Sequence, residues 1–291
     1  MKKLVFFCCC VLFSVLLPLF SQEVNEQDLT VLEKINALKG PGTFPIGDIS
    51  EITISDGYFI TDGNGSRILL ELMENQVSNQ ELALIGADDS NWFAIFEFDP
   101  VGYVPDTEKD SLDADAMLES IKKATEEANI ERRKRGWNDL HITGWWEKPH
   151  YDSKTHNLEW GTICRSKEGE SVNYNIRVLG RKGVMIITLV GDQKQFTSFL
   201  PIFKNILKSF HFTEGNKYAE YKKGDKIAEY GLTALIVGGG AALAAKSGLL
   251  KILWKWLVGV GIFIAGVFKK IFGGGKQKDS EIISDNETED I

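Results

Sequence analysis

The chain has almost no cysteine outside its N-terminal leader. Cys8, Cys9 and Cys10 lie inside an apolar run near the start, and Cys164 is the only other cysteine among the 291 residues. Once such a leader is removed, an intramolecular disulfide is excluded even in a compartment that would permit one. We expect Cys164 to be a small buried side chain rather than a reactive thiol.

The sequence also lacks any catalytic or cofactor motif of recognisable spacing. His141, His150 and His156 could approach Asp152 or Glu147, but the histidines do not have the close spacing of a zinc motif. No serine stands in a recognisable nucleophile phrase. The sequence therefore predicts neither a metal ion nor a cofactor.

Acidic residues are missing altogether from Gly231 to Phe272. This stretch contains one apolar run of 20 residues that ends at Leu250 and a second of 17 residues that ends at Phe268. The only charged residues that interrupt them are Lys246, Lys251 and Lys255. A spanning helix needs roughly 20 mostly apolar residues, so we expect a transmembrane helical hairpin over residues 230–272. Glycine and alanine gather on its helix faces, which would allow homo-oligomerisation in lipid.

The N-terminus has the layout of a secretory signal peptide. Lys2 and Lys3 precede an apolar run over residues 4–20, and the small Ser21 follows it. We predict a signal peptide over residues 1–21 and a main domain on the extracytoplasmic, or periplasmic, side of the inner membrane. The rest of the chain is expected to consist of a flexible N-terminal segment over 22–42, the domain over 43–213, a juxtamembrane linker over 214–229 and an acidic tail over 273–291.

The exported part of the chain is acidic. Residues 22–213 contain 31 Asp and Glu against 20 Lys and Arg, a net charge of −11. Nucleic acid is excluded as a partner class, because duplex binding needs a basic surface. An anionic bilayer would also repel such a surface, so we expect the domain to stand off the membrane on its linker.

Hydrophobic periodicity predicts an α+β domain with an antiparallel sheet and packed helices. Four strand-like segments between His141 and Val190 are joined by connections too short for crossover helices, which indicates a meander. Residues 46–54 and 58–61 are expected to form a hairpin, and residues 82–85 and 92–98 to form core strands. Helices are expected over residues 66–75, 112–135 and 192–210, the last kinked or restarted at Pro201.

Several phrases, in one order along nearly the whole mature chain, resemble the DUF2167 family of predicted membrane-anchored bacterial proteins. They are Gly102-Tyr103-Val104, Asn129 with Glu131-Arg132, Gly144-Trp145-Trp146, Pro149-His150-Tyr151-Asp152, Leu158-Glu159-Trp160, Asn173 through Arg181, and Asp225-Lys226 running on to Tyr230-Gly231. The chain departs from the family at Met73 to Val77, where the family resembles Trp-Gly-Asn-Pro-Pro. The resemblance implies a membrane anchor but no activity. The helix, meander and phenylalanine-rich helix are also similar to the PsbP and Mog1 type of sandwich.

Aromatic and arginine residues on the meander form the best candidate for a recognition surface, because interfaces are enriched in these side chains. The candidate binding residues are Trp146, Tyr151, Asp152, Trp160, Asn173, Tyr174, Arg177 and Arg181. The alternative is that the aromatic rings are core and the arginines pair with nearby carboxylates.

Two functions remain open from the sequence. The first is a membrane-anchored envelope protein that binds another envelope protein, or a cell-wall or lipid component, without catalysis. The second is a membrane-anchored hydrolase that uses a site near His150, Asp152 and Arg177. The two differ in whether these three side chains converge in one enclosed site.

Overall fold

The computed structural model describes residues 34–87 and 92–237. The predicted signal peptide, most of the predicted hairpin and the acidic tail lie outside these residues. Within the described ranges no helix is both long and apolar enough to cross a bilayer.

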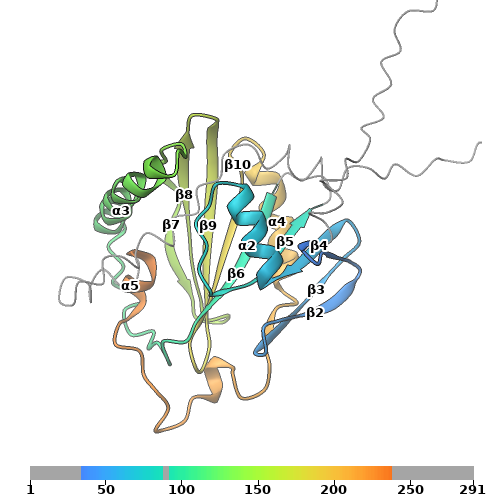
Figure 1. Ribbon diagram of the computed structural model, residues 1–291. Coiled ribbons are helices and arrows are strands. Elements are labelled where there is room, and N and C mark those ends of the chain that lie inside the picture. Colours follow the sequence, from blue (N-terminus) through green and yellow to red (C-terminus); the bar gives the residue numbers. More distant parts are fainter. Residues whose placement is uncertain (1–33, 88–91, 238–291) are drawn as a thin grey trace, which may run out of the picture.

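An eight-stranded antiparallel sheet forms the centre of the fold (Figure 1). Its strands, in spatial order, are β1 (Leu38–Lys39), β4 (Tyr58–Asp62), β5 (Glu81–Ala87), β6 (Trp92–Asp99), β10 (Val184–Asp192), β9 (Gly169–Leu179), β8 (Asn157–Ser166) and β7 (His141–Asp152). Strands β7 to β10, which follow one another along the chain, pair as neighbours, which confirms the predicted meander. The α+β class with a large antiparallel sheet is likewise confirmed.

Helices and a second, small sheet cover the two faces of the large sheet. A three-stranded sheet of β11 (His211–Phe212), β3 (Ser50–Ile54) and β2 (Gly42–Ile46) packs with α4 (Phe196–Leu207) on one face. The other face carries α2 (Gly63–Leu72), α3 (Ala114–Lys134) and α5 (Leu232–Val237). Because strand residues alternate between faces, each strand supplies side chains to both cores.

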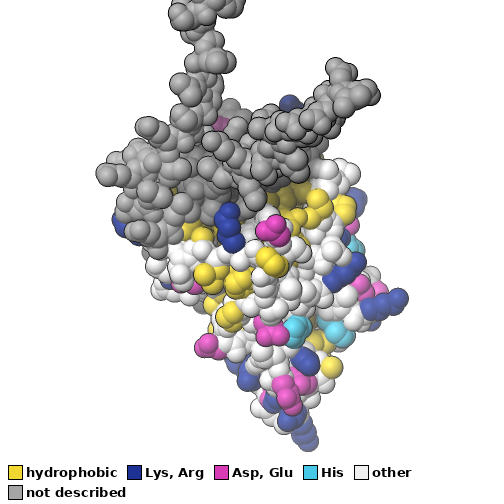
Figure 2. All heavy atoms as spheres, turned by 90° about the vertical axis from the view of Figure 1, so that its right-hand side faces the viewer, with side chains coloured by type: hydrophobic (Ala, Val, Ile, Leu, Met, Phe, Trp, Pro, Cys, Tyr) yellow, Lys and Arg dark blue, Asp and Glu magenta, His cyan; other side chains and the backbone are white. Residues whose placement is uncertain are grey.

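The first face holds the larger core. Tyr174 and Ile176 of β9 and Ile187 and Leu189 of β10 lie under Phe203 of α4, and all are buried. Figure 2 views the side of the molecule to which the small sheet and α4 belong, and hydrophobic side chains gather in the middle of that view. Helix α4 continues through Pro201 as one helix, so of the two outcomes expected there, a kink or a restart, the restart is wrong.

The predicted hairpin between residues 46–54 and 58–61 is wrong. Strand β3 pairs with β2 and β11 in the small sheet, whereas β4 pairs with β1 and β5 in the large one. The tight turn lies earlier, at Gly47, whose φ of 59° favours glycine. The sequence from Ser55 to Gly57 therefore carries the chain from one sheet to the other.

The expected flexible N-terminal segment is ordered where the structure describes it. Ile35 is completely buried against α2, and β1 adds to the edge of the large sheet beside β4. Burying an isoleucine side chain contributes about 1.5–3 kcal/mol, which is enough to hold a short segment in place. The domain therefore begins before residue 43.

The expected linker over residues 214–229 is not a free tether. We call residues 213–231 the C-terminal arm; it includes a short 3-10 helix, η1 (Tyr218–Glu220), and runs along the lower end of the domain to α5 (Figure 1). Tyr218 is buried, and Leu232 and Leu235 of α5 pack in the same core as Met117 of α3. The arm and α5 are therefore parts of the domain.

Candidate functional site

Arg181 and Asp225 make the first contact between the sheet and the arm. The guanidinium at the β9–β10 turn donates from Nε to Asp225 Oδ2 at 2.7 Å and from Nη2 to Oδ1 at 2.8 Å. This bidentate geometry is the strongest form of the pair. The hydrogen bonds from the Arg181 side chain, together with one from the Lys222 backbone N–H, lower the pKa of Asp225 to about 2. The Arg181 backbone N–H also donates to Asn216 O, so the turn holds two points of the arm.

A row of aromatic rings makes the second contact. Tyr103, which follows β6, stacks on Tyr218 with 4.5 Å between ring centroids and lies 4.3 Å from Tyr221. His156 also packs against Tyr218, with 4.5 Å between ring centroids, and its Nδ1 is 3.1 Å from the Tyr151 hydroxyl. The β7–β8 hairpin, the segment after β6 and the arm therefore share one aromatic cluster.

Backbone hydrogen bonds make the third contact, beside the aromatic cluster. Tyr103 N–H donates to Lys226 O at 2.8 Å, and Ala228 N–H donates to Tyr103 O at 2.8 Å, so the arm pairs with this segment in parallel. Gly102 makes the approach feasible. Its φ is 102°, and a Cβ at this position would lie 2.5 Å from Lys226 O. A side chain there would force the arm away.

Tyr230 and Asp99 make the fourth contact, at the end of β6. The Tyr230 hydroxyl donates to Asp99 Oδ2 at 2.9 Å. Burial raises the pKa of Asp99 above its usual range, while the Tyr230 hydrogen bond and the charge of Arg177 lower it in part. Tyr230, which directly precedes the apolar stretch, is thus joined to the central sheet.

Arg177 lies at the centre of the sheet face behind this contact. Its side chain is only 4% exposed, its guanidinium lies 4.7 Å from the Trp160 ring centroid, and Nη1 donates to Ile176 O at 3.3 Å. Burial lowers its pKa to about 10, against the opposing charges of Glu97 and Asp99. Burial likewise raises the pKa of Glu97 to about 8, and repulsion by Glu81 adds to this. At neutral pH Glu97 is therefore mostly protonated, which limits the cost of burying it.

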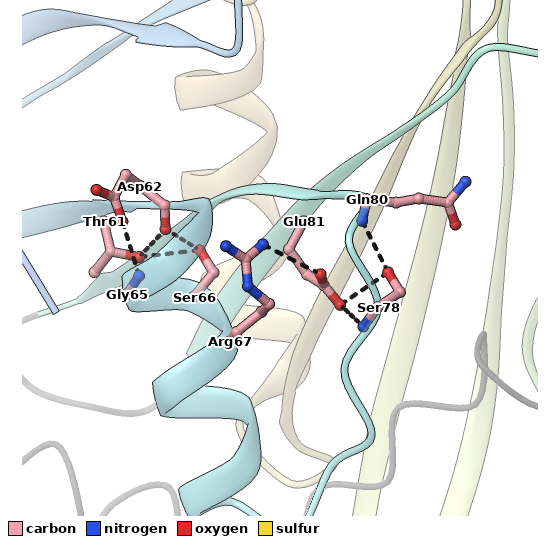
Figure 3. A network of polar contacts seen from close by, with 8 residues as sticks. All are labelled: Thr61, Asp62, Gly65, Ser66, Arg67, Ser78, Gln80 and Glu81. Atoms are coloured by element: carbon pink, nitrogen blue, oxygen red, sulfur yellow. Dashed lines mark hydrogen bonds and ion pairs between the residues drawn. The ribbon is translucent and has the colours of Figure 1, made fainter.

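Glu81 and Glu97 face each other across β5 and β6, and the start of α2 and the loop before β5 orient Glu81 (Figure 3). Glu81 Oε1 accepts from the Ser78 hydroxyl at 3.0 Å and from the Ser78 N–H, and Oε2 lies 3.8 Å from Arg67 of α2. Asp62 caps α2 by accepting from Gly65 N–H at 2.8 Å. Figure 3 shows Arg67 of α2 and Ser78 of the loop before β5 both directed toward the Glu81 carboxylate.

The structure divides the eight sequence-predicted residues between the two faces of the sheet. Trp160, Asn173, Arg177 and Tyr151 share the face that carries α3, and Arg181 holds the arm beyond it. Trp146 and Tyr174 belong to the opposite core, where Trp146 lies 5.0 Å from Phe196 and 5.9 Å from Tyr174. Asp152 accepts from Lys154 N–H at 2.8 Å in the β7–β8 turn.

Tyr174 is further tied to α4. Its hydroxyl donates to Glu159 Oε2 at 2.8 Å, and Lys204 of α4 forms an ion pair with the same oxygen at 3.1 Å. Lys204 also lies 4.9 Å from the Tyr174 ring centroid. Trp146 and Tyr174 therefore hold α4 to the sheet and do not share a surface with Arg177.

His150, Asp152 and Arg177 do not converge. His150 pairs across the strands with Glu159, whose side chain faces α4, and its Nδ1 lies 3.4 Å from Glu147 Oε1. Arg177 is buried on the other face, and Asp152 is engaged in its own turn. In the described part of the chain, no three His, Cys, Asp or Glu side chains are grouped as metal ligands would be.

Sequence reasoning missed Glu97, Asp99, Asp225 and Tyr230 as site residues. Two signals could have found three of them. Glu97 interrupts an otherwise apolar strand between Phe96 and Phe98, where an acid needs a partner. Tyr103 stands in one phrase, and Asp225 and Tyr230 stand in another far along the sequence. The structure joins the two phrases, because Tyr103 pairs with the arm in which Asp225 and Tyr230 lie.

Arg132 lies at the basic C-terminal end of α3, yet its side chain is buried. It donates to Asn138 O at 2.6 Å and to Glu74 O at 3.0 Å. It therefore bridges the end of α3 to the loop after α2. Arg133 and Arg135, in the same helix end, are exposed.

Comparison with known proteins gives a family and distant structural likenesses. The chain is similar to the cyanobacterial PsbP protein of Synechocystis sp. PCC 6803, with 10% identity, a TM-score of 0.38, and coverage of 62% of this chain and 94% of that one. It is also similar to a protein of unknown function from Pseudomonas aeruginosa, with 10% identity, a TM-score of 0.25, and coverage of 58% and 94%. No curated protein matches. A family model described as a protein of unknown function, DUF2167, matches residues 38–269, and the chain therefore belongs to the DUF2167 family.

Proposed function

We propose that the chain is a membrane-anchored envelope protein whose extracytoplasmic domain is a non-enzymatic interaction module, held by its arm in a fixed orientation to the anchor. Residues 1–21 would direct export, and the stretch over residues 230–272 would insert in the inner membrane as a helical hairpin. The partner would be another envelope protein, or a cell-wall or lipid component.

The observation that carries this proposal is the docking of the arm. The chain reaches the apolar stretch at Gly231, directly after four separate contacts with the domain, the last of them between Tyr230 and Asp99. A flexible linker would let the domain rotate freely above a membrane. A docked arm instead fixes which end of the domain faces the bilayer, as an interaction module of defined orientation requires.

The ionisable groups of the site support an interaction role over hydrolysis. Glu97, Asp99 and Arg177 all have pKa values shifted by burial, but they act on one another and on Tyr230 in the attachment of the arm. His150 and Asp152, the other members of the hydrolase alternative, lie apart from them. The shifted groups therefore have a structural task at the junction between the domain and the anchor.

Membrane fractionation of cells that express the full chain tests the anchor. The full chain should stay with membranes after alkaline carbonate washing, and protease added to intact spheroplasts should digest its domain. A chain truncated after Val237 should appear in the soluble envelope fraction. Retention of the truncated chain in the membrane, or a domain that resists external protease until lysis, would contradict the proposal.

Crosslinking tests the interaction role. A crosslinker placed at exposed Ile202 of α4 or at Ile227 of the arm should capture one envelope component reproducibly from intact cells. The matched control is a crosslinker at Lys167, an exposed position at the opposite end of the meander. Equal capture from all three positions would indicate collision rather than a defined partner.

A further inference from the structure

A strip of buried polar side chains runs along the middle of the sheet face that carries α2 and α3. Asn173, Asn175 and Arg177 alternate along β9 and therefore point to the same side of the sheet. Thr188 of β10 pairs with Asn175, and Thr162 of β8 pairs with Asn173. None of these five residues is more than 7% exposed, and we call them the polar strip. The strip lies between two apolar cores, one packed with α2 and the other with α3.

The loop over residues 73–80, between α2 and β5, crosses the polar strip. Its start is joined to α3, because Arg132 donates to Glu74 O, and its end lies at β5, where Ser78 donates to Glu81. In the sheet, β6, β10, β9 and β8 lie between β5 and β7, the strand that α3 contacts. The loop therefore passes above the central strands, and Figure 1 shows it running down the sheet face between α2 and α3.

Two side chains of this loop carry buried polar atoms without a hydrogen bond. Among the residues that the structure describes, Asn75 Oδ1 and Gln76 Nε2 have no hydrogen-bond partner. Arg177 is short of acceptors as well. Of its five N–H donors, one on Nη1 reaches Ile176 O at 3.3 Å, and no described carboxylate forms an ion pair with it. Buried polar groups are normally bonded, so groups that lack partners indicate a place where a ligand or ordered water binds.

The chemistry of the strip suits a ligand that carries a carboxylate. A buried cation without a contacting carboxylate is stabilised by an anionic partner, and the planar guanidinium of Arg177 matches the two carboxylate oxygens. Glu97 adds little repulsion at neutral pH, because burial raises its pKa to about 8. Asp99 is not in contact with Arg177 and accepts from Tyr230 at the arm instead. The amides of loop 73–80 supply donors and acceptors for the other polar atoms of the ligand.

We propose that the polar strip binds a small organic carboxylate, with Arg177 on its carboxyl group and with Asn75 and Gln76 of loop 73–80 on its other polar atoms. The loop covers the site, since it is bonded to α3 at one end and to β5 at the other. Peptides with a free C-terminus and sugar acids share this chemistry. The inference goes beyond the proposed interaction role and does not depend on the membrane anchor, so each can fail without the other.

Calorimetric titration of the full chain, purified in detergent, tests the site. The probes are acetyl-alanyl-alanine and glucuronate, and each is compared with a neutral counterpart, the dipeptide amide or glucose. We expect saturable binding of at least one carboxylate, about tenfold or more tighter than its neutral counterpart, because hydrogen bonds to a charged group discriminate by about that factor. Arg177→Lys keeps the charge but loses the planar pair of donors, and it should weaken this binding by about tenfold.

A substitution in the loop separates binding from folding. Gln76→Met keeps the length of the side chain but removes its amide. The variant should bind the carboxylate about fivefold more weakly without a lower melting temperature, because Gln76 Nε2 has no described partner in the ligand-free protein. The matched control is Gln195→Met, at an exposed position beside α4 on the opposite face, which should bind as the unmodified chain does. Circular dichroism checks that each variant is folded.

Proton uptake shows whether the ligand lies at Arg177. Glu97 faces Arg177, Glu81 and Asp99, and about half of the Glu97 side chains are ionised at pH 8. A carboxylate bound beside Arg177 disfavours that charge, so binding at pH 8 should take up as much as about half a proton per ligand. Titration in two amine buffers that differ in ionisation enthalpy measures the uptake, which should disappear in Glu97→Gln.

Three results would overturn the inference: no binding of either carboxylate, equal binding of a carboxylate and its neutral counterpart, or equal weakening in Gln76→Met and Gln195→Met. Binding without proton uptake at pH 8 would place the ligand away from Arg177 and would also reject the site. Tighter binding of the dipeptide identifies a peptide as the class of ligand, and tighter binding of glucuronate identifies a sugar acid.

Discussion

Tyr230 donates its hydroxyl proton to Asp99 across 131 positions of sequence, and this contact ties the last residue before Gly231 to a central strand of the domain. Asp99 in turn lies in the field of Arg177, which is buried on the same sheet face. A change in the charge of Asp99 or Arg177 would therefore alter the hydrogen bond that holds Tyr230, at the point where the chain leaves the domain.

The stability of the domain should depend on pH through Glu97. Its pKa is about 8 in the folded chain and about 4.3 in an unfolded one, so between these values only the folded state holds the proton. The free energy of unfolding should therefore fall as pH rises through this window, by up to about 1.4 kcal/mol per pH unit. Urea unfolding from pH 5 to pH 8 measures this slope, and Glu97→Gln should flatten it. An unchanged slope in that variant would assign the dependence to another group.

The approach of the arm at Gly102 should be sensitive to one methyl group. In Gly102→Ala the new Cβ would meet Lys226 O at 2.5 Å and the backbone would keep an unfavourable φ of 102°. The matched control is Gly136→Ala, which has a φ of 75° but nothing within 4 Å of its Cβ. The control should cost about 1 kcal/mol from the backbone alone, and Gly102→Ala should cost more and expose the arm to protease. Equal costs and equal cleavage would show that the close approach does not matter.

The elements predicted correctly are those whose periodicity is set by one buried face. Helix α3 and the meander follow from such patterns, as does the α+β class. The sequence suggests that β3 pairs with β4, because both strands are short and apolar. The packing of the small sheet with α4 instead determines which strand β3 pairs with. Local sequence contains no signal for that choice.

The candidate site could be predicted only in part, because the expected set mixed two faces of the sheet. Tyr174 and Arg177 are three positions apart on β9, an odd separation, so alternation places them on opposite faces. Alternation alone could have separated them. The docking of the arm could not be foreseen in this way, since Lys217 to Asp225 is polar and glycine-containing like a linker. Its attachment uses backbone hydrogen bonds and single side chains that follow no period.

The side of the membrane on which the tail lies tests how the apolar stretch is divided between the domain and the bilayer. Leu232–Val237 forms α5 on the domain, and the 13 residues that remain up to Leu250 would span only about 20 Å, short of the roughly 30 Å hydrocarbon core. A hairpin with the tail outside therefore requires α5 to leave the domain on insertion, while the arm up to Tyr230 stays docked. We expect Ser284→Cys to react with a membrane-impermeant reagent in intact spheroplasts. Reaction only after lysis would indicate a single crossing with the tail inside.

Hydrogen exchange of the arm in the full, membrane-embedded chain tests the central claim most directly. The amide of Ala228 donates to Tyr103 O, and the amide of Arg181 donates to Asn216 O. A docked arm predicts slow exchange in peptides that cover residues 222–231, and faster exchange there in Arg181→Met, which removes the bidentate bond to Asp225 but leaves the sheet intact. Complete exchange of these peptides at the shortest labelling time in the unmodified chain would show a free linker and would contradict the account.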